Sequence, residues 1–343
     1  MIQHLLQLIW NQRKQNAWLW AELLLVSVFL WFLVDYLYVM GRTYTAPLGF
    51  DIRHTYSIVI SSLSERSPDY IPKEKRERPD GVHLLTALDR IRTYPGVESA
   101  CLTDGGMPYY MGSRNLVWRI DTLQVPCRYA FVTPEFFDVF RIYDKDGKTA
   151  SLKRAIEDNN SIVISADVET MNRGNVTDEI EETIRGISVP IRRHEYTKAE
   201  PNVYRALRLS RMEEGYYEGM IDAVRLCVRV RPDVDNADFP ARFRKDMAEQ
   251  LRLGNLYLLD VQPLSYIRDG YIRSIGVENE VKTRVAVACF LLANIFLGII
   301  GTFWFRTEYR KGEMGLRMAL GSTRRQLNSI MVGEGVLLLV LAF

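Results

Sequence analysis

Few residues of this chain have the types and spacing that catalysis or metal binding requires. The tripeptide GKT at 147–149 has the ending of a phosphate-binding loop, but the pattern GxxxxGK[ST] needs glycine where the chain has Ile142. The four histidines and four cysteines show no zinc-site spacing. Asp233 and Asp235 lack the glycine and terminal glutamate of an EF-hand. The sequence therefore predicts no metal site, no cofactor held by this chain and no catalytic residue.

A second stretch that could take part in ligand binding combines glycines with tyrosines. Asp104, Gly105 and Gly106 are followed closely by Tyr109 and Tyr110. Glycine-rich loops and tyrosines can edge a binding cleft, although such residues also form ordinary surface turns. The sequence favours a plain loop and leaves the cleft as the alternative.

The most informative segment lies at 306–326. Its residues 313–320 predict about two helical turns, with Leu316 and Leu320 four positions apart on one face. Gly321 suits the end of that helix, and a T-x-x-Q capping box at 323–326 predicts the start of the next one. A loop that only anchors topology would explain the basic residues but not this ordered pattern. We therefore expect a short docking helix.

Two long apolar segments position the docking helix. Residues 17–40 and 282–305 each exceed the roughly 20 residues that a helix needs to cross a bilayer. Residues 327–343 predict a third transmembrane helix, which the sequence leaves truncated. Lys and Arg concentrate before the first span and after the second, which predicts that both flanks are cytoplasmic: Arg13, Lys14, Arg306, Arg310, Lys311, Arg317, Arg324 and Arg325.

The residues between the first two spans, 41–281, are then expected outside the cytoplasm. Period-two and helical patterns alternate there, which predicts a mixed α and β domain of two subdomains with a boundary near 165–175. Residues 264–281 predict a stalk helix that continues toward the second span. Residues 1–16 predict an amphipathic helix in the membrane interface.

The individual elements expected in this domain follow from local patterns. Strands are expected at 56–63, 97–102, 115–120, 125–132, 161–165, 223–230 and 256–261, and helices at 81–94 and 239–251. The spacing of Cys101 and Cys127 permits a disulfide without indicating one. The fold class expected is a membrane α-helical protein with a mixed α and β extracytoplasmic domain.

The segment RKGEMGLRMALGSTRRQ resembles the hallmark of MacB/FtsX-type permeases of ABC transporters, whose pattern runs roughly E-I-G-x-x-x-A-L-G-A/S-T/S before basic residues. The strings PGVESACL and TPEFFDVFRI also resemble that family's outer domain. Matching positions, with Leu316 added from the helical stripe, give the residues expected to couple to an ATPase: Glu313, Gly315, Leu316, Arg317, Ala319, Leu320, Gly321, Thr323 and Arg324, with Ser322 and Arg325 beside them.

The resemblance implies a permease subunit in the inner membrane that is not itself an enzyme. A separate ABC ATPase subunit would hold ATP and Mg²⁺ and grip the docking helix, and a second permease subunit would complete a homodimer or heterodimer. Motion of the spans would reach the outer domain, which is mechanotransmission, for export or envelope efflux. Membrane lipid and a periplasmic adaptor or substrate are the other partners that it implies.

Two alternatives remain open. An FtsX-like regulator would use the same motion to activate an extracytoplasmic partner such as a cell-wall hydrolase, and a receptor would signal inward from a ligand-sensing outer domain. The net charge of +2 on 343 residues gives no reason to expect nucleic acid as a partner.

Overall fold

The computed structural model describes residues 13–112, 114–120, 123–157, 161–166, 183–329 and 331–333. They divide into two compact units, Thr43–Gly276 and a second unit formed by Met1–Arg42 with Val277–Phe343. Three predictions lie wholly or largely outside the described residues: the interfacial helix before residue 13, the subdomain boundary near 165–175, and the third span beyond residue 333.

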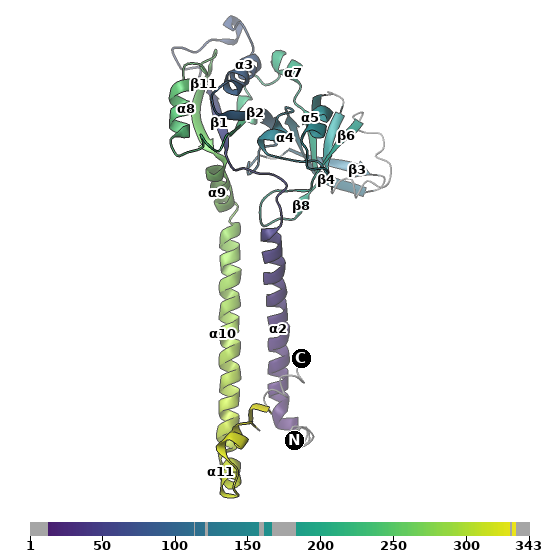
Figure 1. Ribbon diagram of the computed structural model, residues 1–343, viewed down its shortest axis with the longest axis vertical. Helices are drawn as coiled ribbons and strands as arrows, with labels where there is room; N and C mark the ends of the chain where they lie inside the picture. The colour runs from purple at the N-terminus through teal and green to yellow at the C-terminus, as the bar shows by residue number, and fades with distance from the viewer. Residues whose placement is uncertain are drawn as a thin grey trace. The chain divides into compact units, whose positions relative to one another are not determined.

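Two long helices dominate the second unit, α2 (Arg13–Thr45) and α10 (Val277–Tyr309) (Figure 1). Each contains a stretch long and apolar enough to cross a membrane, Leu24–Thr45 and Val277–Gly298, by length and composition. Their large apolar side chains are exposed; Trp31 is 75% exposed and Phe290 is 67% exposed. The core helix of a water-soluble protein would bury such side chains instead.

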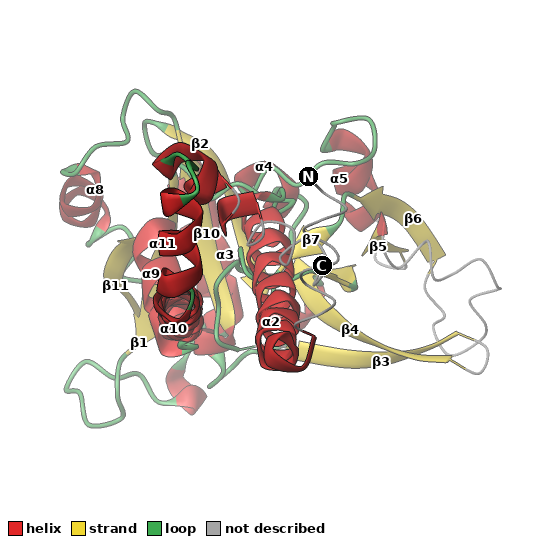
Figure 2. Ribbon diagram, turned by 90° about the horizontal axis from the view of Figure 1, so that it is seen from below, coloured by secondary structure: helices red, strands yellow, loops and turns green. Residues whose placement is uncertain are grey.

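The other unit is built on one mixed sheet in the order β11-β1-β10-β2-β4-β9-β5-β6, with β3 paired to the outer part of β4 (Figure 2). Neighbours are antiparallel except for the pairs β4/β9 and β5/β6, which are parallel. The strands are β1 (Thr55–Ser62), β2 (Val97–Asp104), β3 (Arg114–Ile120), β4 (Leu123–Val132), β5 (Ser161–Ser165), β6 (Thr183–Ser188), β9 (Asn202–Ala206), β10 (Val224–Val230) and β11 (Leu256–Pro263). A small hairpin of β7 (Ile191–Arg192) and β8 (Ala199–Glu200) stands apart from this sheet.

The helices of this unit are α3 (Asp80–Arg92), α4 (Phe136–Val139), α5 (Ala150–Glu157), α7 (Leu209–Glu213), α8 (Phe239–Met247) and α9 (Leu264–Ser274). Helices α3 and α8 bury Leu88 and Phe243 against one face of the β1, β2 and β10 strands. Helices α4 and α5 bury Phe136 and Leu152 on the opposite face. Both faces of the sheet therefore carry cores, and neighbouring residues of β10 are buried in different ones, Leu226 in the first and Cys227 in the second.

The period-two patterns located most of the strands. The strand at Ser161–Ser165 is confirmed with the predicted bounds, and the other predicted strands are confirmed with shifts of one or two residues at their ends. Strands β6, β7, β8 and β9 were not predicted, because they are short and polar or lie close to turns.

The predicted continuous stalk helix from Leu264 is wrong. Helix α9 ends at Ser274, and α10 begins only at Val277. Between them, Gly276 adopts a φ of +69°, a backbone conformation that an α-helix cannot contain. The apolar periodicity continues across this break, so it gave no sign of the interruption.

The disulfide that the spacing of Cys101 and Cys127 permits is absent. All three cysteines of this unit are buried and none forms a disulfide, and Cys101 lies directly opposite Cys227 in the β2/β10 ladder. Cys127 packs in a different apolar cluster, with Ile162 and Val203. Burial, followed by the hydrogen bond with Cys227, raises the pKa of the Cys101 thiol, so it remains protonated near neutral pH.

Candidate functional site

A short helix, α11 (Lys311–Ala319), is present where the sequence predicts a docking helix. Glu313 lies between two guanidinium groups, with Arg310 Nε at 2.9 Å and Arg317 Nη2 at 2.7 Å. The hydrogen bond from Arg310 is the main cause that lowers the pKa of Glu313, so the carboxylate is ionised near neutral pH. These pairs join one turn of the helix to the next.

Gly321 ends α11 in the predicted manner. Its φ is +96°, its N–H donates to the Met318 carbonyl at 3.0 Å, and the Ser322 N–H donates to the Arg317 carbonyl at 3.0 Å. This pair of bonds is a Schellman motif, which satisfies carbonyls at the helix end that would otherwise lack partners.

The capping box is also present. The Thr323 N–H donates to Gln326 Oε1 at 2.9 Å, and the Gln326 N–H donates to Thr323 Oγ1 at 3.4 Å. A further helix follows at 324–329, and its Leu327 is buried at the side of α11 that carries Met314. The short helix therefore has a defined C-terminal end and is supported on one side by the helix that follows it.

The opposite side of α11 is apolar and uncovered. Leu316 on that side is 64% exposed, and Leu320, directly after the last helical residue, is 80% exposed. Gly315 lies in the helix with open space where a Cβ would project, and Ala319 is the last helical residue. Arg324 is exposed at the start of the next helix. The nine predicted coupling residues thus lie on α11, at its end and at the start of the next helix.

A second candidate site was not predicted. The hairpin formed by residues 191–200, here called the anchoring hairpin, holds both chain segments that leave the sheet domain. Arg192 is 5% exposed and donates from Nε to the Thr197 carbonyl at 2.6 Å. Its two Nη atoms donate to the carbonyls of Thr43 and Ala46, at the end of α2. A cation here satisfies terminal carbonyls and complements the helix dipole.

The same hairpin holds α9. Glu195 Oε1 accepts hydrogen bonds from Arg268 Nε at 2.6 Å and from the Tyr109 hydroxyl at 3.0 Å. Burial by itself raises the pKa of Glu195, but these bonds outweigh it and the pKa lies below its usual value. The ring of Tyr271, also on α9, lies 5.9 Å from His194 and 5.9 Å from Tyr109 between ring centres.

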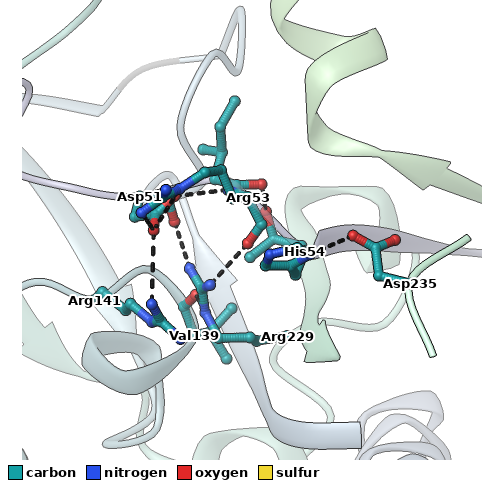
Figure 3. Close-up of polar contacts among 9 residues, drawn as sticks. Asp51, Arg53, His54, Val139, Arg141, Arg229 and Asp235 are labelled. Atoms are coloured by element: carbon teal, nitrogen blue, oxygen red, sulfur yellow. Dashed lines mark hydrogen bonds and ion pairs between the residues drawn. The ribbon is translucent and has the colours of Figure 1, made fainter. Parts of the chain in front are cut away.

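Arg229 fixes the chain just beyond α2. It is fully buried, and its guanidinium donates to the carbonyls of Val139, Arg53 and Asp51, each at 2.7 Å (Figure 3). Arg141 also lies near Asp51, with Nη1 3.9 Å from its carboxylate. Each of these hydrogen bonds from the Arg229 guanidinium goes to a backbone carbonyl, which indicates a structural role.

Two weaker candidate sites of the sequence have ordinary structural roles: the GKT tripeptide lies in a turn, and Asp235 pairs with neighbouring side chains. Within the GKT tripeptide, the Lys148 N–H is bonded to Asp144 Oδ1 at 2.8 Å, and Gly147 has a φ of +74°. Asp235 accepts from the Tyr56 hydroxyl and lies 2.5 Å from His54 Nδ1 (Figure 3). Among the described residues, no group of three His, Cys, Asp or Glu side chains could hold a metal ion.

The glycine and tyrosine loop lies beside the anchoring hairpin. Gly105, Gly106, Tyr109 and Tyr110 line a small cavity together with Arg193 of the hairpin. Tyr109 has a φ of +57°, which is unusual for a bulky residue. These residues therefore lie at the edge of a cavity, as in the alternative interpretation of this stretch.

Comparison with solved structures gives distant matches to three outer domains. A domain described as that of a permease from Porphyromonas gingivalis is 18% identical over 62% of this chain and 91% of that one, with a TM-score of 0.38. The periplasmic region of MacB from Actinobacillus actinomycetemcomitans is 9% identical over 68% and 97%, with a TM-score of 0.36. The extracellular domain of the ABC-type transporter YknZ from Gram-positive bacteria is 10% identical over 60% and 100%, with a TM-score of 0.33.

The likeness to solved domains is remote, and what MacB or YknZ transports is not thereby known for this chain. No protein-family model matches the chain, and no curated protein matches it. The roles of the MacB-like coupling segment and of the anchoring hairpin must therefore be argued from their own residues.

Proposed function

We propose that this chain is the membrane subunit of a MacB/FtsX-type ABC transporter. In this proposal α2 and α10 cross the inner membrane, the sheet domain lies outside the cytoplasm, and α11 lies on the cytoplasmic side. The observation that carries it is the exposed apolar side of α11, where Leu316 and Leu320 face solvent from a helix that is firmly ended and supported. Large apolar side chains gathered on a small, ordered element are typical of a docking surface.

The occupant of that surface would be a separate ATPase subunit. It would bind ATP and Mg²⁺, so that this chain would catalyse nothing itself. The basic residues around α11 support the cytoplasmic placement, since positive charge is enriched in the loops on that side. A second permease subunit, of the same or a different kind, would complete the pair that two ATPase subunits require.

The anchoring hairpin supports mechanotransmission as the mode of action. It bonds to the end of α2 through Arg192 and to α9 through Glu195, so both connections to the apolar helices converge on ten residues. A shift of one helix relative to the other would strain these bonds and move the sheet domain. That motion would serve export or envelope efflux, with lipid around the helices and an adaptor or substrate at the outer domain.

Affinity purification of the full-length chain from its native membrane tests the docking surface. We expect an ABC ATPase to co-purify with the wild type and the preparation to hydrolyse ATP. The double variant Leu316→Asp, Leu320→Asp should retain about a tenth or less of that ATPase, because each leucine loses a burial contribution of about 1.5–3 kcal/mol. Co-purifying proteins are identified by mass spectrometry.

The matched control is Leu209→Asp, the same change at a residue that is 49% exposed in the sheet domain. It should leave the amount of ATPase unchanged. If no ATPase accompanies the wild type, or if the double variant retains it at the control level while inserted and folded, the proposal is wrong. An inward-signalling receptor would then be the better explanation.

A further inference from the structure

The cavity beside the anchoring hairpin is lined by two arginines, each with a buried Nε that has no hydrogen-bond partner. Its volume is about 30 Å³, and its walls include Arg128 of β4, Arg193 of the hairpin and the tyrosines Tyr109, Tyr110 and Tyr271. A volume of roughly 10–15 Å³ on this measure holds one water molecule. The cavity therefore has room for a small polar group and not for a large ligand as a whole.

Arg128 reaches the cavity from the sheet. In the strand, its side chain is on the same face as Ala130 and Val132, which belong to the core around Phe136. Its Nε is buried and has no hydrogen-bond partner. Burial first, and then the nearby charge of Arg193, lower the pKa of Arg128, which shows that the two guanidinium groups repel each other.

Arg193 meets it from the hairpin. Its Nε is likewise buried without a hydrogen-bond partner, and its guanidinium carbon lies 5.9 Å from the centre of the Tyr271 ring. The arginine next to it in the chain, Arg192, differs in that all its donor nitrogens are bonded to backbone carbonyls. Arg193 therefore has an unbonded Nε–H donor at the cavity wall.

No carboxylate of the described residues neutralises this pair. Glu195 is bonded to Arg268 and Tyr109, and Glu200 attracts Arg128 electrostatically without an ion pair between them. Two partly desolvated like charges with unsatisfied donors are costly unless an anion offsets them. Planar guanidinium donors suit the oxygens of a carboxylate or a phosphate group.

We propose that Arg128 and Arg193 bind a compact oxyanion in this cavity, a carboxylate or phosphate group, with the tyrosines beside it. The group is either a free anion or the charged end of a larger molecule whose remainder stays outside. The backbone around the cavity is built for close approach: Gly105 has a φ of +81°, and a Cβ on Gly106 would lie 2.5 Å from Thr103 Oγ1. The site lies wholly within Thr43–Gly276 and does not depend on the ATPase proposal.

Binding of inorganic phosphate and of acetate to the full-length chain in detergent tests the site. Equilibrium dialysis with radiolabelled phosphate or acetate, at fixed ionic strength, should give saturable binding of one anion per chain. Arg128→Gln and Arg193→Gln should each weaken it about tenfold or more, because each removes a charge-assisted bond. Lys198→Gln, which removes a charge from an exposed position of the same hairpin, should leave it unchanged.

A second readout separates a ligand site from a structural role. Without anion, both arginine variants should unfold at the same temperature as the wild type or higher, because one of two repelling charges is gone. Saturating anion should raise the unfolding temperature of the wild type only. Binding of phosphate alone, of acetate alone or of both identifies the group and supports the site in each case.

Three results would overturn the proposal. They are no saturable binding of either anion to the wild type, equal binding to the arginine variants, and a lower unfolding temperature of both variants without anion. Equal binding would mean that the anion associates elsewhere on the chain.

Discussion

At the scale of single residues, the outer domain depends on arginines that bond to the backbone. Arg229 and Arg192 each satisfy at least three carbonyls at positions where the chain leaves regular structure. Arginine suits this task because its planar group offers five donors and keeps its charge. No pattern in the sequence distinguishes these two arginines from the many arginines that lie at the surface.

Replacement of Arg229 by methionine should destabilise the domain by about 3–5 kcal/mol, because it leaves three buried carbonyls without donors. For a domain of this size that corresponds to a fall in unfolding temperature of roughly 10 °C, measurable by scanning fluorimetry. Arg231→Met, at an exposed position two residues along, serves as the control and should shift it little. Equal shifts in both variants would contradict the structural role of Arg229.

Glu195 predicts a dependence on pH. Its pKa in the folded chain lies below the ordinary 4.5, so its ionised form adds stability that is fully present above pH 4.5 and is lost as the pH falls through the lower folded value. Between pH 6 and pH 3.5, the wild type should therefore lose more stability than Glu195→Gln does. The exposed change Glu249→Gln should follow the wild type, and a wild-type profile parallel to that of Glu195→Gln would refute the prediction.

At the scale of elements, the docking helix illustrates how much local sequence can specify. The Schellman motif at Gly321 ends α11 and the capping box at Thr323 begins the next helix, and both are made by contacts between residues three to five positions apart. Helix α9 shows the opposite case, since apolar periodicity predicted that it continues where Gly276 interrupts it. A periodic pattern reports which face is buried and not whether the axis bends.

Two alanine substitutions should act on α11 in opposite directions. Gly321→Ala should weaken the end of the helix by about 1–2 kcal/mol, because alanine disfavours positive φ. Gly312→Ala, within the helix and with open space around it, should strengthen it by roughly 0.5–1 kcal/mol. Hydrogen exchange of residues 311–322, followed by mass spectrometry, should become faster in the first variant and slower in the second. Changes of the same sign in both would contradict the assigned helix end.

At the scale of the whole molecule, the proposal makes a statement about topology. If α2 and α10 cross the membrane, residues 43–276 and 306–326 lie on opposite sides of it. Positive charge near the helix ends decides which side is which, and a large domain can cross to the outside despite its own charge.

Cysteine labelling of intact cells checks this topology. With Cys289 replaced by alanine, the three remaining cysteines are buried. A membrane-impermeant maleimide should then label Lys75→Cys in the sheet domain but not Arg325→Cys after α11. Permeabilised cells provide the control, in which both should react. Labelling of both variants in intact cells, or of Arg325→Cys alone, would rule out the proposed orientation.

The sequence by itself determined the features that depend on neighbours along the chain. These are the two long apolar helices, most strands of the sheet, and α11 with its caps, because apolar periodicity and turn chemistry act over a few residues. Only the tertiary structure decided that Arg192 and Glu195 join the end of α2 to α9, that Cys101 faces Cys227, and that Arg128 meets Arg193. Those pairs are 65 to 149 positions apart, and a single sequence contains no period that reports such distant contacts.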